Sequence, residues 1–422
     1  MEPHQEIYVL KGITHLCLKQ PGSSGDLIFI VLSRVLNPGE SAPARNRHSR
    51  RRRRASLLSK GTRQILPGFV AFFIATYLLG QLIPSPAIPS NIVFIGPKYD
   101  YYQAHKDEYN TLFFGSSRIY SQVIPEVFDK TAKERGLALN SYNFGIPAMR
   151  AIDSTVLLET VLANPPKNLK WVFFESILDK GYEPIPNART HRAMYWHDWE
   201  STGFAARYIL SSDESLPNKA VLLSSHFLPF LYHHLNVGRL FRQMLPSSFS
   251  LEEQAVAAEF TATEGFYALS DETAPERQQF LNDQQAYLDS VAVLGSRTAD
   301  TPWSPTVLEN SKDSKAYLSA NKAMLLNRIT EAVRAAGAEP VFIDPPSLHL
   351  ENDFPAAQQL GKIDQLLTYR DPNRFPQLYA LQNRYDADHL NRAGSKEFTR
   401  LIAQDFNHTI ASTAQDKALK IP

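Results

Sequence analysis

The sequence predicts an α/β fold in which helices cover both faces of a parallel sheet. From Tyr109 onward, short apolar strands alternate with amphipathic helices, which is the pattern of β-α-β units. The chain has 422 residues, of which 43% are apolar, so it can bury a sizeable core. A formal net charge of +1 argues against a nucleic-acid partner, and a single cysteine excludes an intrachain disulfide.

Residues 1–64 form a basic segment that we expect to be mostly disordered and cytoplasmic. Arginines crowd into its end, with five consecutive ones at Arg50–Arg54, and the uncharged apolar run Leu66–Ile83 follows. This run is near the lower limit for crossing a bilayer, so residues 65–84 are predicted to be a single-pass transmembrane anchor in the cell membrane. The positive-inside rule then makes everything after the anchor extracytoplasmic, that is, periplasmic. A cleaved signal peptide is the alternative interpretation.

The exported part is predicted to be one domain over residues 105–412. Strands are expected at Thr111–Phe114, Ser141–Phe144, Lys170–Phe174, Pro340–Ile343 and Gln377–Ala380. Helices are expected at Pro125–Arg135, Ile152–Ala163, Ala320–Ala335 and Arg392–Phe406. Residues from about 180 to 312 do not fit this alternation and are too many for a structureless connection. We therefore expect a mostly helical insertion there.

Two short motifs carry the chemistry that the sequence offers. Gly115-Ser-Ser117 follows directly after a predicted buried strand, and Asp386 and His389 lie three residues apart near the C-terminus. A serine hydroxyl needs a base to remove its proton, and the base needs a partner that fixes its tautomer. In open α/β sheets, such groups gather beyond the carboxyl ends of the strands. Alternatively, Ser117 caps a helix and His389 is a surface histidine at a helix start.

These motifs resemble the blocks of the SGNH (GDSL-like) serine hydrolases, in particular their membrane-anchored envelope branch. The resemblance implies a flavodoxin-like three-layer sandwich with a parallel sheet, with Ser117 as nucleophile, His389 as base and Asp386 as the group that orients the base. It also implies an oxyanion hole formed by the backbone N–H groups of Ser117 and Gly145. No cofactor is implied.

The third block of that family has no counterpart here. The family pattern is Gly-x-Asn-Asp after the third strand, whereas this chain continues Glu175-Ser-Ile177. Losing one oxyanion donor costs about 10²–10³ in turnover, so we expect Ser176 or Arg118 to substitute for the missing asparagine. Arg150 is a further candidate for binding an anionic substrate group.

The resemblance implies a membrane-tethered serine esterase that acts on acyl esters, most simply O-acetyl groups of an envelope polysaccharide. An O-acyltransferase uses the same acyl-enzyme and is a close alternative; it would need a polytopic membrane partner that carries acyl groups across the bilayer. The alternative from another class is a degenerate domain that binds glycan or acts as a scaffold.

Overall fold

The computed structural model describes residues 60–81, 88–90, 92–175, 177–179, 181–183, 190–235, 251–300, 318–348 and 353–419. The expectation of disorder in residues 1–64 therefore falls almost entirely outside the described residues. The chain divides into two compact units, Met1–Ala75 and Thr76–Pro422. The second unit contains the sheet and every residue predicted for the site.

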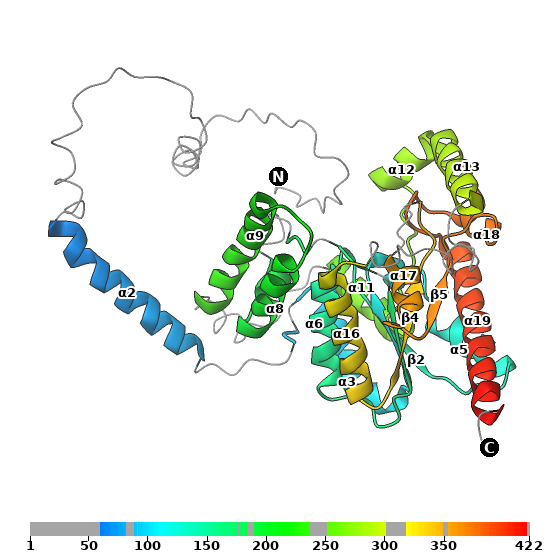
Figure 1. The fold of residues 1–422 in the computed structure, drawn as a ribbon, viewed down its shortest axis with the longest axis horizontal. Helices are drawn as coiled ribbons and strands as arrows, with labels where there is room; N and C mark the ends of the chain where they lie inside the picture. Colours follow the sequence, from blue (N-terminus) through cyan, green and yellow to red (C-terminus); the bar gives the residue numbers. More distant parts are fainter. Residues whose placement is uncertain are drawn as a thin grey trace. The chain divides into compact units, whose positions relative to one another are not determined.

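Five strands form one sheet in which all neighbours are parallel (Figure 1). They are β1 (Thr111–Gly115), β2 (Ser141–Gly145), β3 (Trp171–Glu175), β4 (Glu339–Asp344) and β5 (Leu366–Thr368). Their order is β2-β1-β3-β4-β5. The chain therefore reverses its direction of travel across the sheet next to β1, which is where open α/β sheets place their sites. The predicted α/β class with a parallel sheet is confirmed.

The strands are buried along most of their length because both faces of the sheet are covered. Successive side chains point to opposite faces. Thus Phe113 and Phe173 belong to one apolar cluster, and Phe114 and Phe174 belong to the other. The two aromatic pairs stand side by side across β1 and β3, since Phe113 is in register with Phe173 and Phe114 with Phe174.

Helices bury each face. One face packs against α5 (Pro125–Glu134) and α19 (Arg392–Leu419), whose buried residues include Phe128 and Phe398. The other packs against α3 (Ile95–His105), α6 (Ala151–Leu162) and α16 (Ala320–Ala335). In Figure 1 these two groups of helices lie on opposite sides of the strands. The short helix α4 (Ser117–Tyr120) follows β1 directly.

Further helices occupy the stretch in which the insertion was expected. They are α7 (His191–Trp196), α8 (Trp199–Leu210), α9 (Leu216–Leu235), α11 (Leu251–Ala262), α12 (Pro275–Asn282) and α13 (Gln284–Asp300). The remaining elements are α17 (Asp353–Gln359), α18 (Pro376–Tyr379) and the 3-10 turns η2 (Lys106–Glu108) and η4 (Leu381–Asn383). The described part of the stretch is thus mostly helical.

One expected strand is wrong. Gln377–Ala380 does not join the sheet; most of it belongs to the helix α18, which has Pro376 at its first position. Proline favours that position because its ring fixes φ near the helical value and its missing N–H is not needed there. The last strand is β5, which pairs with β4.

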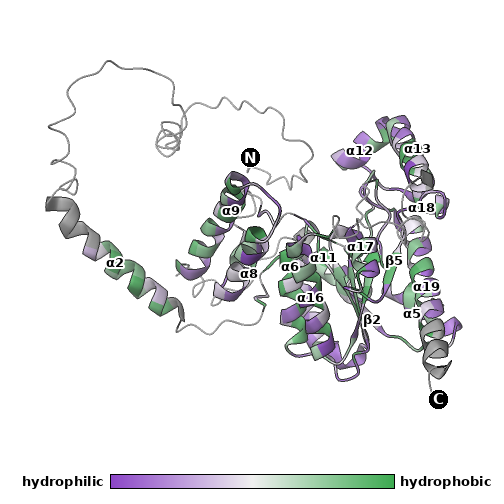
Figure 2. Cartoon of the chain, viewed as in Figure 1, coloured by the Kyte–Doolittle hydropathy of each residue, from purple (hydrophilic) through white to green (hydrophobic). Residues whose placement is uncertain are grey.

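The helix α2 (Lys60–Gln81) covers most of the predicted anchor at 65–84, of which residues 82–84 lie outside the described residues. Hydrophobic residues recur along the coloured part of this helix in Figure 2, and several are exposed to more than half of their surface, among them Phe69, Phe72 and Leu78. Across the described residues, no helix combines the length and the apolar character needed to cross a membrane.

Candidate active site

The turn after β1 presents Ser117 at the carboxyl end of the sheet. Ser116 is the N-cap of α4, and its hydroxyl accepts the Arg118 backbone N–H at 3.3 Å. Ser117 is the first helical residue, so the capping role that was its alternative interpretation falls to its neighbour. Among the described residues, the Ser117 backbone N–H has no acceptor. A donor in this place is available to a developing oxyanion.

His389 brings a base to this serine. Ser117 Oγ lies 2.8 Å from His389 Nε2, although the two residues are 272 positions apart in the chain. His389 Nδ1 lies 2.9 Å from Asp386 Oδ2 and 3.0 Å from Oδ1. With the Nδ1 hydrogen directed at the carboxylate, Nε2 is the nitrogen that accepts the serine proton. The structure thus brings the three residues predicted for catalysis into one hydrogen-bonded chain.

The Asp386 carboxylate is held by its own loop as well as by the imidazole. Its Oδ1 accepts the backbone N–H groups of Asp388 and His389 at 2.7 and 2.8 Å. Burial alone raises the pKa of Asp386, but the hydrogen bond and charge of His389 and the two backbone N–H groups together hold that pKa below its ordinary value. The carboxylate is therefore ionised at neutral pH and can fix the imidazole.

A buried arginine shapes the loop that carries these two residues. Arg384 is 1% exposed, and its side chain donates to the carbonyls of Asp386 and Ala387. An antiparallel bridge joins Arg384 to Leu390, and the Tyr385 N–H donates to the His389 carbonyl at 2.9 Å. The segment from Arg384 to Leu390 is thus a closed loop whose shape does not depend on a substrate.

Gly145 lies beside the turn that carries Ser117, but its N–H is engaged. It donates to the Asn143 side-chain oxygen at 2.7 Å, and the Asn143 amide donates to the carbonyls of Ile119 and Val123. A Cβ on Gly145 would lie 2.1 Å from the Tyr120 nitrogen, so the position requires glycine for close packing. For Gly145 to serve as an oxyanion donor, its bond to Asn143 has to break.

Lys98 is a buried residue at this site that the sequence did not reveal. Its ammonium group donates to the carbonyls of Gly145 at 2.7 Å and Asn143 at 2.9 Å. It also lies over the rings of Tyr120 and Phe260, at 4.7 and 4.8 Å from their centroids. Burial lowers the pKa of Lys98 well below its usual range. Because Lys98 comes from α3, well before the first strand, no motif spacing could have indicated it.

Glu175 is the second residue that was missed in this role. It ends β3 and stands where the family pattern changes, and its side chain is fully buried. Its carboxylate accepts hydrogen bonds from the Ser116 backbone N–H and the Ser116 hydroxyl. It also forms an ion pair with Arg118, whose Nε lies 2.7 Å from Glu175 Oε1. Glu175 thus ties the Arg118 side chain to the turn that carries Ser117.

Within the described part of the chain, no contact places the other residues predicted to contact substrate at the site. Arg150 is exposed and precedes α6, where its carbonyl accepts the Ser154 N–H at 2.9 Å. Ser176 lies outside the described residues.

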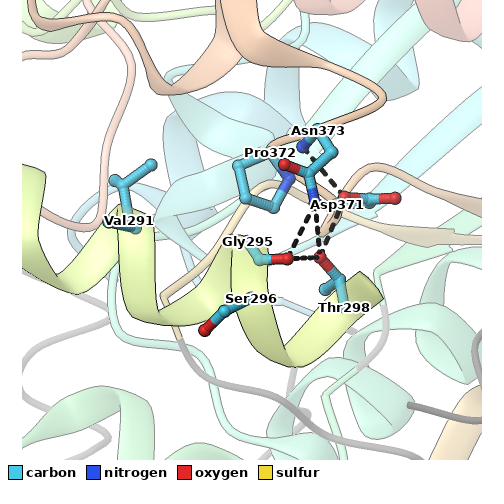
Figure 3. Close-up of a pocket in the computed structure, with 8 residues that line it drawn as sticks. Val291, Gly295, Ser296, Thr298, Asp371, Pro372 and Asn373 are labelled. Atoms are coloured by element: carbon cyan, nitrogen blue, oxygen red, sulfur yellow. Dashed lines mark hydrogen bonds between the residues drawn. The ribbon is translucent and has the colours of Figure 1, made fainter. Parts of the chain in front are cut away.

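A pocket in another part of the unit does not involve these residues. It lies between α13 and the segment 371–373 (Figure 3) and is lined by Val291, Ala292, Gly295, Ser296, Thr298, Asp371, Pro372 and Asn373. Its polar groups bind one another: Thr298 donates to Asp371 at 3.0 Å and Asn373 donates to the Gly295 carbonyl at 2.8 Å. Within the described ranges, no group of three His, Cys, Asp or Glu side chains could hold a metal ion.

Comparison with known proteins adds nothing to what the geometry of this site shows. No protein-family model matches the chain, and no curated protein matches its sequence.

Proposed function

We propose that the chain is a serine esterase of the SGNH type with a flavodoxin-like three-layer fold, which acts through an acyl-enzyme. The observation that carries this proposal is the hydrogen-bonded chain in which Ser117 Oγ lies 2.8 Å from His389 Nε2 and His389 Nδ1 lies 2.9 Å from Asp386. His389 takes the Ser117 proton as the oxygen attacks the acyl carbonyl, and returns it to the leaving alcohol. Water then attacks the acyl-enzyme with His389 acting again as base.

The substrate class of this proposal is an acyl ester, most simply an O-acetyl group of an envelope polysaccharide. It rests on the predicted tether at residues 65–84, since an enzyme fixed to a membrane surface favours a substrate that is fixed nearby. The exposed apolar side chains of α2 support such a tether. In this proposal the catalytic unit is extracytoplasmic and the N-terminal segment is cytoplasmic.

Covalent labelling with a fluorophosphonate probe tests the nucleophile. The wild-type chain is expected to be labelled at Ser117, and the label is lost in Ser117→Ala because the alanine has no oxygen to form the adduct. Ser290→Ala is a matched control, since this exposed serine of α13 bonds its own helix. Labelling that persists in Ser117→Ala, or wild-type protein that is never labelled, rules out the esterase.

Release of acetate from an O-acetylated polysaccharide then tests the substrate class. Hydrolysis yields free acetate at the same rate with or without a second sugar. If an added sugar acceptor diverts the acetyl group, the enzyme is an O-acyltransferase, because the two reactions share the acyl-enzyme and differ only in the acceptor.

Two observations favour a second candidate, a degenerate domain that binds glycan. The Gly145 N–H is bonded to Asn143, and Glu175 stands where the family pattern has a different sequence, so the oxyanion site has fewer donors than the resemblance implies. Such a domain would bind polysaccharide without releasing acetate and without reacting with the fluorophosphonate.

A further inference from the structure

Glu175 holds the residues on both sides of Ser117. Its carboxylate accepts the Ser116 backbone N–H, the Ser116 hydroxyl at 3.0 Å and the Arg118 Nε at 2.7 Å. The residue before the nucleophile and the residue after it are thus tied to one group at the end of β3. A turn held in this way leaves Ser117 little freedom to change its direction.

The glycine before the turn is fitted to this carboxylate. A Cβ at Gly115 would lie 2.5 Å from Glu175 Oε2 and 2.6 Å from Glu175 Cβ, distances that real contacts do not reach. The Glu175 side chain therefore packs directly against the backbone of the turn. Gly115, Ser116, Arg118 and Glu175 form a matched set, which we call the Glu175 clamp.

The clamp also determines the charge beside the nucleophile. The Glu175 side chain is 0% exposed, so its negative charge is poorly screened by water, whereas the Arg118 side chain is 21% exposed. An unpaired carboxylate here would oppose the negative charge that develops on an acyl oxygen during attack. The Arg118 guanidinium cancels it.

The clamp fixes the donor on which the oxyanion depends. With the Gly145 N–H engaged by Asn143, the Ser117 N–H is the predicted oxyanion donor that remains without an acceptor among the described residues. Its direction is set by the turn between Ser116 and Arg118. A shift of this turn would misplace the donor and the nucleophile together.

We propose that Glu175 and Arg118 are a positioning pair for Ser117. Glu175 fixes the turn, and Arg118 neutralises Glu175 so that negative charge can form on the acyl oxygen. Neither residue transfers a proton. This inference rests on the proposed role of Ser117 as nucleophile.

Inhibition by benzeneboronic acid tests the pair, because boronate forms a tetrahedral anion on a serine oxygen. In Arg118→Gln we expect the inhibition constant to rise, and kcat for a neutral aryl acetate to fall, by about 10²-fold each. KM changes little, since the ground-state ester carries no charge. Arg118→Lys, which keeps the charge but not the fork of donors, is expected to lie between Arg118→Gln and wild type.

The double variant Arg118→Gln/Glu175→Gln gives the decisive comparison. Removing both charges restores kcat by about tenfold over Arg118→Gln alone, because the buried carboxylate is no longer left without its partner. Rates are measured well below the midpoint of unfolding of each variant, so that stability does not enter. Glu175→Gln alone is measured beside them, and a double variant in which kcat falls by the product of the losses in Arg118→Gln and Glu175→Gln contradicts the proposal.

Two further measurements separate this inference from the proposed function. Arg135→Gln is the matched control, since this exposed arginine follows α5 as its C-cap and should leave kcat and boronate inhibition unchanged. Hydrogen exchange of the Ser116 amide needs no activity: Glu175→Met removes its acceptor and should accelerate exchange by about tenfold or more. If wild type does not react with fluorophosphonate, the esterase fails; if it reacts but Ser116 exchange and boronate inhibition are unchanged in the variants, only the positioning pair fails.

Discussion

Asp386 and His389 reach their geometry through a turn that is only four residues long. The aspartate accepts two backbone N–H groups of its own turn and faces His389 Nδ1 with both oxygens. Since the same carboxylate closes the turn and orients the ring, the relative position of base and partner is set locally. The long-range requirement is only that the Ser117 hydroxyl lies within hydrogen-bond distance of His389 Nε2.

Asp386→Asn separates these two roles. The asparagine oxygen can still accept the two backbone N–H groups, so the turn should persist. Its NH₂ group, however, would donate to His389 Nδ1, which moves the ring hydrogen to Nε2 and leaves no acceptor for the Ser117 proton. We expect kcat for an aryl acetate to fall by about 10⁴-fold with little change in the midpoint of unfolding.

The neighbouring carboxylate provides the control for this variant. Asp388→Asn changes charge equally, but the contact that Asp388 makes to another element is through its backbone carbonyl, which accepts from Gln122 at 3.4 Å. Activity should therefore remain close to that of wild type. Equal losses in the two variants would show that net charge matters and not the hydrogen bond to Nδ1.

The residues of the site differ in how far the sequence could predict them. Ser117, Asp386 and His389 stand in short motifs whose chemistry is recognisable from residue type and spacing. Glu175 was read only as a departure from a family pattern, because nothing in a strand-end glutamate indicates that it will accept from Ser116 and Arg118. The engagement of Gly145 by Asn143 depends on a side-chain rotamer, which no sequence pattern specifies.

At the scale of elements, β1 to β4 were predicted to within one residue at each end, and two of these strands have a continuous apolar run. β1 reads TLFFG and β3 reads WVFFE, and both are central in the sheet. β5 has only three residues, LLT, and pairs only with β4, so its apolar signal was too short to recognise. The sequence predicted the last strand at 377–380 instead, but Pro376 starts a helix there.

The helix α3 was also absent from the predicted elements. It begins at Ile95 and buries Tyr102, yet it carries the charged residues Lys98 and Asp100 and lacks a clear apolar face. Tertiary packing stabilises it, because Tyr102 contacts the rings of Tyr109 and Phe144.

Glu183 follows β3 in the chain and interacts with two helices, α9 and α6. Its backbone N–H donates to Ser225 of α9 at 3.2 Å, and its carboxyl group lies near the buried Asp153 of α6. Burial, followed by the charge of Asp153, raises the pKa of Glu183 to about 9, against the opposing effect of Arg192. The group is therefore protonated in the folded protein at neutral pH.

Glu183 is expected to make the protein less stable as pH rises. Its folded pKa of about 9 lies above the ordinary value of 4.5, so the folded state keeps a proton that the unfolded state loses between these values. This contribution is complete below pH 4.5 and is lost as pH rises through 9. Glu183→Gln, which stays neutral, should raise the midpoint of unfolding at pH 8.5 by on the order of a few degrees and leave it nearly unchanged at pH 4.5.

The matched control is an exposed glutamate outside this group. Glu134→Gln, at the end of α5, should show the pH dependence of wild type. Thermal unfolding followed by circular dichroism at both pH values measures the effect. A Glu183→Gln protein whose curve parallels wild type from pH 4.5 to 8.5 would show that Glu183 is ionised in the folded state.

On the scale of the whole molecule, the sheet separates two apolar clusters, and both are built from strands and helices far apart in sequence. Phe113 of β1 packs with Phe128 of α5 and Phe173 of β3, and Phe406 of α19 contacts Phe173. The C-terminal helix that follows the Asp386–His389 loop is thereby fixed to β3, the neighbour of the strand that leads into Ser117's turn. The distance between Ser117 and His389 is thus a consequence of core packing as well as of the loop.

The exposed phenylalanines of α2 give the last prediction, which concerns the chain and the membrane. Phe69, Phe72 and Phe73 are 58%, 64% and 43% exposed. If the helix enters a bilayer, changing all three to Asp costs about 3 kcal/mol for each residue near the membrane centre. We expect wild-type chain to sediment with membranes and resist carbonate extraction, and the triple variant to be soluble but equally labelled at Ser117.

Leucine at the three positions preserves apolar character and should keep the chain in the membrane. Extraction of wild type by carbonate would indicate attachment at the surface only, and a wild-type chain that never sediments with membranes would refute the tether while leaving the catalytic proposal intact.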